Sequence, residues 1–162
     1  MTITTKTEQM VARFDAVNDE AIALVDGCGD ERWRAASAAE GWSAAVVAHH
    51  IAAVHGEFMP LARAFAGGET FSPGSSMHDV DRINAEHASE FANAGKAETV
   101  EALRTNGASL AQLLRTITDD ALDRTAGTYG GREMTVAQVV EWIIIGHAQE
   151  HLASLRATVT GR

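Results

Sequence analysis

Cysteine and proline are both scarce in this sequence, and each scarcity excludes a class of protein. Cys28 is the single cysteine among the 162 residues, so no internal disulfide can form and a disulfide-stabilised secreted scaffold is excluded. Pro60 and Pro73 are the two prolines, and so low a content favours long, uninterrupted helices. The first ten residues do not pair a charged segment with an apolar run, so we expect no signal peptide and a cytoplasmic location.

Clustered positive charge and long apolar runs are missing as well. The formal net charge is −9 with neutral histidines, and the scattered basic residues do not form the patch that nucleic-acid binding needs. The longest apolar run, from Val139 to Ile145, is interrupted by Glu141 and is too short to cross a bilayer. We therefore expect neither a nucleic-acid partner nor a membrane span.

What the sequence does contain is apolar residues at three- and four-residue steps, which predict helices. With 46% hydrophobic residues, the chain is long enough for one domain over residues 1–162. Ser43 and Thr135 are predicted N-caps, and Pro60 should kink or split the helix that contains it. The predicted fold is an all-α four-helix bundle whose helical segments cover 5–25, 43–66, 79–93, 97–118 and 135–158.

The remaining stretches are predicted to be irregular. Residues 30–41 form a connector with Trp33 tucked into the bundle. The segments on either side of Gly95 fit one long bent helix. Residues 119–134 form a loop that carries a Gly130-Gly131 turn signal.

Seven histidines are many for this length, and helical phase indicates which of them point inward. On the last helix, His147 lies within about 10° of the centre of the apolar face and His151 within about 40°. These two residues are four positions apart and are therefore neighbours. On the second helix, His50 lies roughly 45° from the apolar centre, whereas His49 lies about 145° away and is expected to face solvent.

Three inward imidazoles on two helices favour a metal site. Burying each one uncharged and unpaired costs a few kcal/mol, and a divalent metal removes that cost because neutral imidazole is a good ligand for zinc, and also for nickel or iron. His50, His147 and His151 are the predicted ligands, which leaves an open position for water or substrate. The competing interpretation stays open, since i,i+4 histidine pairs also occur as ordinary surface or hydrogen-bonded residues.

Glu150 lies between the two histidines of the last helix. The stretch HAQEH also matches the HxxEH pattern of inverted zinc proteases, but none of the eleven residues after His151 is His, Asp, Glu or Cys, so that class is excluded. Glu150 is instead predicted to be a helix-surface carboxylate or to orient a ligand imidazole, with a role as general base as a further alternative.

His87 lies between Ile83 and Phe91 on an apolar stripe of the third helical segment. It could line the pocket, replace His50 as a ligand, or be a hydrogen-bonded core histidine. Asn84 is predicted to lie at the rim of the same cavity. His87 and Asn84 are therefore candidate pocket-lining residues for a small-molecule substrate.

Two motifs resemble the DinB-like superfamily. GWSAAVVAHHIA (41–52) resembles the opening of that family's second helix, in which a metal ligand stands eight residues after the tryptophan, here His50 after Trp42. MTVAQVVEWIIIGHAQEHLASL (134–155) resembles its final helix, with ligands at His147 and His151, and residues 84–123 look like its middle region. The resemblance covers nearly the whole chain.

The resemblance implies an up-down-down-up four-helix bundle, a three-histidine metal site at one end and a homodimer. Family members include mycothiol-dependent isomerases and bacillithiol S-transferases, and others hydrolyse reactive electrophiles. The isomerase type often has Glu where this chain has His147, which argues against that specific reaction. We therefore expect a metal-dependent transferase that uses a low-molecular-weight thiol, such as mycothiol or bacillithiol, on small electrophiles. A hydrolase of a small reactive compound, or a non-catalytic stress protein that binds small molecules and a metal, is the alternative.

Overall fold

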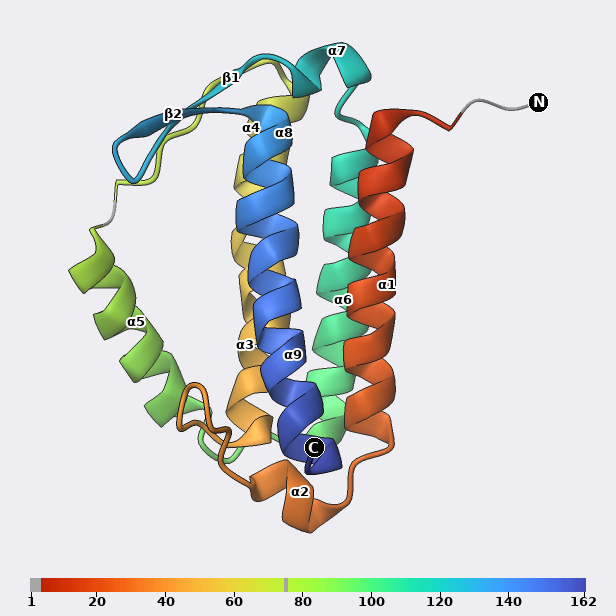
Figure 1. Ribbon diagram of the computed structural model, residues 1–162, viewed down its shortest axis with the longest axis vertical. Coiled ribbons are helices and arrows are strands. Elements are labelled where there is room, and N and C mark those ends of the chain that lie inside the picture. Colours follow the sequence, from red (N-terminus) through yellow and green to blue (C-terminus); the bar gives the residue numbers. More distant parts are fainter. Residues whose placement is uncertain (1–3, 75) are drawn as a thin grey trace.

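The computed structural model describes residues 4–74 and 76–162 and is built around four helical rods (Figure 1). In this view the first and last rods run downward and the middle two run upward. This order is equivalent to the expected up-down-down-up topology, and the all-α prediction is confirmed. The rods are α1 (Lys6–Asp26), α3 (Ala44–Glu57) continued by α4 (Met59–Ala66), α6 (Lys96–Arg115), and the C-terminal run of α8 (Val136–Gln138), the π-helical η1 (Val139–Ile145) and α9 (Gly146–Thr160).

The predicted caps hold the ends of two rods. The Ser43 hydroxyl accepts a hydrogen bond from the Val46 N–H at 3.3 Å at the start of α3, and Thr135 forms a reciprocal capping box with Gln138 at the start of α8. Pro60 is in the first turn of α4, and α3 ends at Glu57 just before it. The second rod is therefore split, as expected, because proline cannot donate the backbone hydrogen bond that would continue α3.

The interpretation of one long bent helix around Gly95 is wrong. Helix α5 (Met77–Glu90) is a separate element that contacts α3, and a turn at residues 91–94 reverses the chain into α6. No residue of α5 is buried. Figure 1 shows α5 slanting away from the bundle toward its N-terminus. The apolar residues of α5 are too few to hold it in the core, so it lies on the outside of the bundle.

The loop predicted for residues 119–134 contains more structure than the sequence indicated. The short helix α7 (Asp119–Leu122) is followed by a two-stranded antiparallel hairpin, β1 (Thr125–Tyr129) and β2 (Arg132–Thr135). The Gly130-Gly131 turn is confirmed, and both glycines have positive φ, of 57° and 80°, as a tight hairpin turn requires. The loop before α5 runs along β1, where the Phe71 N–H donates to the Ala126 carbonyl at 2.7 Å.

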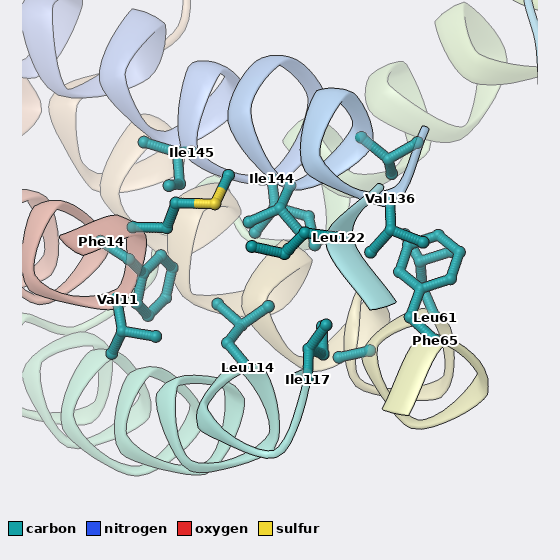
Figure 2. Close-up of a cluster of buried hydrophobic side chains, with 14 of the residues drawn as sticks. Val11, Phe14, Leu61, Phe65, Leu114, Ile117, Leu122, Val136, Ile144 and Ile145 are labelled. Atoms are coloured by element: carbon teal, nitrogen blue, oxygen red, sulfur yellow. The ribbon is translucent and has the colours of Figure 1, made fainter. Parts of the chain in front are cut away.

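Two groups of buried apolar side chains fill the bundle. The upper cluster packs side chains from α1, α4, α6 and the C-terminal rod (Figure 2). The lower cluster includes Val47, Ile51, Ala148 and Leu152, which are sequence neighbours of the predicted metal ligands. Trp33 of the short helix α2 (Asp30–Arg34) belongs to this lower cluster, as expected, and its indole N–H donates to the Ala94 carbonyl at 3.0 Å.

Candidate metal centre

The three predicted ligands meet in the lower half of the bundle. His50 comes from α3, and His147 and His151 come from successive turns of α9. One nitrogen from each ring lies within 4.8 Å of the other two, and this is the one group of three such side chains that could hold a metal within residues 4–74 and 76–162. The Nε2 atoms of His50 and His147 are 3.1 Å apart. The helical phase of His50, His147 and His151 therefore predicts their convergence correctly.

The separation of the His50 and His147 nitrogens fits a divalent metal. Zinc–nitrogen bonds of about 2.0–2.1 Å in tetrahedral geometry place two ligand nitrogens roughly 3.3 Å apart, close to the separation of the His50 and His147 Nε2 atoms. The same separation also allows a hydrogen bond between the two rings. The donor set of three imidazoles is one that suits zinc, nickel or iron.

The protonation states of His50 and His147 favour a metal over protons. Burial lowers the pKa of His50 to about 3, with a further contribution from the neighbouring His147 and His151. Burial, then His151 and the more distant His55, lower the pKa of His147 to about 3. Both rings are therefore neutral at neutral pH, and a cation would not have to displace protons from them.

Glu40 orients His151, the third predicted ligand, and sequence reasoning did not identify it. Its Oε1 accepts a hydrogen bond from Nδ1 of His151 at 2.9 Å, and both side chains are mostly shielded, with 13% and 14% of their surface exposed. This bond fixes the proton on Nδ1 and leaves Nε2 of His151 as the free ligand atom. Burial raises the pKa of Glu40, but hydrogen bonds from Ser154, Ser37 and His151 together bring it below its usual value, so the carboxylate stays charged.

A tight turn between α2 and α3 places Glu40 in this position. Ala36 and Ser43 form an isolated antiparallel bridge that closes the turn, and Gly41 adopts the left-handed φ of 73° that few side chains tolerate. The Ser37 hydroxyl donates to Glu40 at 2.6 Å, and the Ser154 hydroxyl on α9 donates to the same carboxylate oxygen. The carboxylate is thus tied to both the turn and α9.

Aromatic rings border the three histidines. Trp42 lies nearly parallel to His151, with the ring centroids 6.3 Å apart, and packs edge-on to His50 at 5.4 Å. The ring of Phe58 is perpendicular to that of His147, with the centroids 6.0 Å apart. Aromatic walls limit water access around the imidazoles, which strengthens electrostatic interactions there.

The solvent-facing position predicted for His49 is wrong. Its ring is half-buried against α5, stacked on Phe91 at 3.9 Å, and its Nδ1 lies 3.2 Å from Nε2 of His87. Phase within α3 does point His49 away from the bundle, but α5 covers that side. The pKa of His49 is lowered, chiefly by burial and then by His87.

His87 is placed beside the site rather than in it. Its ring centroid is 5.2 Å from that of His50, yet it is not one of the three converging ligands. It is partly exposed and hydrogen-bonded to His49, so it is not a core histidine. Asn84 lies one turn earlier on α5 and is also half-buried, and its role in lining a pocket remains a prediction.

Glu150 lies on the exposed side of α9. The carboxylate that accepts a hydrogen bond from His151 is that of Glu40, on a different element. The reason is geometric: Glu150 precedes His151 by one residue and so projects about 100° away from it around the helix. A catalytic role for Glu150 is not supported by its position and stays a prediction from the sequence.

His55 is the one fully buried histidine that the sequence did not single out. It is 1% exposed, its Nε2 lies 3.1 Å from Oδ1 of Asn18, and the Asn18 amide donates to the Leu103 carbonyl at 3.0 Å. Burial lowers the pKa of His55 to about 4. This polar chain links α1, α3 and α6, and it makes His55 a structural residue.

Comparison with known proteins places these features in a family. The family model described as the DinB superfamily matches residues 13–155. Among solved structures, the mycothiol-dependent maleylpyruvate isomerase is similar with a TM-score of 0.72 and 16% sequence identity, and the match covers 96% of this chain and 63% of that one. A histidine-to-alanine variant of the same isomerase matches with a TM-score of 0.64 and 18% identity over the same shares.

These structural matches show a shared fold, and this chain spans less than two thirds of the isomerase's length. None of the curated protein sequences gives a significant match. No helix among the described residues combines the length and apolarity needed to cross a membrane.

Proposed function

The chain belongs to the DinB superfamily, and from this premise we propose that it is a metal-dependent enzyme that activates a low-molecular-weight thiol for attack on small electrophiles. His50, His147 and His151 would hold the metal, and zinc is the ion that best fits three neutral imidazoles. The observation that carries the proposal is the convergence of these three rings from two separate helices.

A divalent cation held there would supply a Lewis acid that lowers the pKa of a thiol or of water and thereby generates a nucleophile at neutral pH. The protein's own residues prepare the site. His50 and His147 remain unprotonated, and Glu40 holds His151 in the tautomer that can bind a metal. Three protein ligands leave a position open to substrate, which is typical of catalytic rather than structural sites.

The choice of a thiol as nucleophile is supported by the similar fold of an isomerase whose name states its dependence on mycothiol. The family resemblance also places a glutamate in many such isomerases where this chain has His147, so a neutral ligand replaces an anionic one. A third neutral ligand leaves more positive charge on the cation, which favours binding of an anionic thiolate. We therefore propose transfer to an electrophile rather than that particular isomerisation.

The test is turnover of a chromogenic aryl chloride by the zinc-loaded protein with mycothiol, bacillithiol or glutathione, each against a reaction without thiol. The proposal expects thiol-dependent turnover that is lost in His147→Ala. Turnover that is independent of thiol would instead indicate a hydrolase. A complete lack of turnover over a panel of electrophiles, in protein that binds metal, would favour a non-catalytic binding protein.

A further inference from the structure

A second pair of histidines lies outside the three-imidazole centre, at the contact between α5 and α3. Nδ1 of His49 and Nε2 of His87 are 3.2 Å apart. This separation is nearly the same as the 3.1 Å between the Nε2 atoms of His50 and His147. Because two nitrogens bound to one zinc ion lie roughly 3.3 Å apart, the spacing of the outer pair suits a divalent cation as well as that of the inner pair does.

Phe91 holds both rings of the outer pair in place. Its ring stacks on that of His49 with the centroids 3.9 Å apart, and it packs against His87 at 4.7 Å. His87 and Phe91 are four residues apart at the C-terminal end of α5, so they are neighbours on one face. The two imidazoles are therefore already packed in position, and binding an ion would cost little conformational entropy.

The outer pair is accessible from solvent and lies among negative charges. Both of its rings are half-buried, whereas His50 is 5% exposed. The exposed carboxylate of Glu90 acts electrostatically on both rings of the pair. The carboxylate of Glu98, which is also exposed, acts on His49. A cation can thus reach the pair directly from water, and the neighbouring carboxylates favour a positive charge there.

The hydrogen bond between His49 and His87 does not compete strongly with an ion. In the metal-free protein, one of the two facing nitrogens carries a proton and donates it to the other. A neutral imidazole can carry that proton on its other ring nitrogen instead. This change of tautomer leaves both facing nitrogens free to bind a cation, and no proton has to leave the protein.

We propose that His49 and His87 form a second metal site, which binds a borderline divalent cation such as zinc, nickel or copper. These are the ions that imidazole suits best. The site is weaker than the three-imidazole centre because it has two protein ligands, with water in the remaining positions. It therefore fills when metal is in excess and empties on gel filtration. The inference does not depend on the thiol chemistry proposed above.

An ion at this site would join α5 to the bundle. No residue of α5 is buried, so the aromatic contacts of His87 and Phe91 provide much of its attachment to α3. The ring of His87 also lies 5.2 Å from that of His50. The second ion would thus fix the part of α5 that lies beside the three-imidazole centre.

The test is equilibrium dialysis of the untagged protein against excess zinc, followed by long-range proton–nitrogen NMR of the histidine rings. We expect the wild type to bind two equivalents of zinc, the second more weakly than the first. The second equivalent should shift Nδ1 of His49 and Nε2 of His87, the two nitrogens that face each other. Each of His49→Ala and His87→Ala should lose the second equivalent and keep the first.

His78→Ala is the matched control, because His78 is an exposed histidine on the same helix α5, and it should keep both equivalents. Thermal unfolding in excess chelator shows that each variant is folded. The inference would be overturned by a wild type that binds one equivalent in excess zinc. A second equivalent that persists in both His49→Ala and His87→Ala, or that leaves the ring nitrogens of both residues unshifted, would overturn it as well.

Discussion

Removing the charge of Glu40 is the perturbation that separates an organised metal site from three histidines that merely lie close together. In Glu40→Gln, the amide oxygen can still accept the hydrogen bond from Nδ1 of His151, but the negative charge that polarises the ring is lost. In Glu40→Ala, the bond is lost entirely, and the hydroxyls of Ser37 and Ser154 lose their acceptor as well. The His151 ring is then free to rotate or to change tautomer.

The expected magnitude follows from partners of this kind in other metal sites, where their removal weakens metal affinity by about 10- to 100-fold. Glu40→Gln should lie near the lower limit, about 1.4 kcal/mol, and Glu40→Ala near the upper limit, about 2.7 kcal/mol. Ser154→Ala should have a smaller effect than either, because Ser37 and His151 still hold the carboxylate.

The assay is competition for zinc against a chromophoric chelator at fixed pH, with thermal unfolding in excess chelator to show that each variant is folded. Glu150→Gln is the control, because Glu150 lies on the exposed side of α9, and its affinity should equal that of the wild type. Wild-type affinity in Glu40→Ala would refute the assignment of Glu40. An equal loss in Glu150→Gln would show that Glu150, the carboxylate predicted from the sequence, also supports metal binding.

The remaining predictions concern the ligands and the buried polar groups. His147→Ala and His151→Ala should each abolish stoichiometric zinc binding, because the two remaining imidazoles are too few to hold the ion, whereas His49→Ala should retain zinc. Equilibrium dialysis measures the zinc bound by each variant. An equal loss in His49→Ala would contradict the ligand set. In the metal-free protein, His55 binds a proton more readily in the unfolded state than in the folded state, since its pKa in the folded state is lowered to about 4. Its contribution to stability is therefore present above pH ~6.5 and is lost as the pH falls toward 4, by at most about 3 kcal/mol. Urea unfolding at a series of pH values should show that acidification lowers the free energy of unfolding less in His55→Phe than in the wild type. Parallel pH profiles of the two proteins would contradict this. Finally, the hydroxyl of Tyr129 is buried without a hydrogen-bond partner in the described part of the chain. Tyr129→Phe should therefore leave the free energy of unfolding unchanged or raise it by about 1 kcal/mol. If urea unfolding shows that this free energy falls by more than about 1 kcal/mol, the hydroxyl has a partner.

Local rules were sufficient to predict the long helices and the convergence of three histidines. Ser43 and Thr135 cap helices because their hydroxyls satisfy free backbone N–H groups, a rule that needs no tertiary information. His147 faces inward because it lies near the centre of an apolar stripe, and His50 because it lies at the edge of one, which a helical wheel detects. These features depend only on neighbours within one helix.

Features that depend on contacts between distant segments could not be predicted in this way. Glu40 lies in a segment without helical periodicity, and its contact with His151 spans 111 residues of sequence. His49 was expected in solvent because its environment is set by α5, a helix with no buried residue and hence a weak apolar pattern. The hairpin was missed for a similar reason, since β1 and β2 have five and four residues and short strands carry little alternation.

The most direct test of the metal centre is elemental analysis of the protein purified without a polyhistidine tag and without added metal. If the three imidazoles form the site described, the protein should carry close to one equivalent of zinc or another first-row divalent ion per chain, and the triple variant of His50, His147 and His151 to alanine should carry none. A wild-type content below about one-tenth of an equivalent, unchanged after incubation with zinc and gel filtration, would mean that the three rings pair with one another and do not bind a metal.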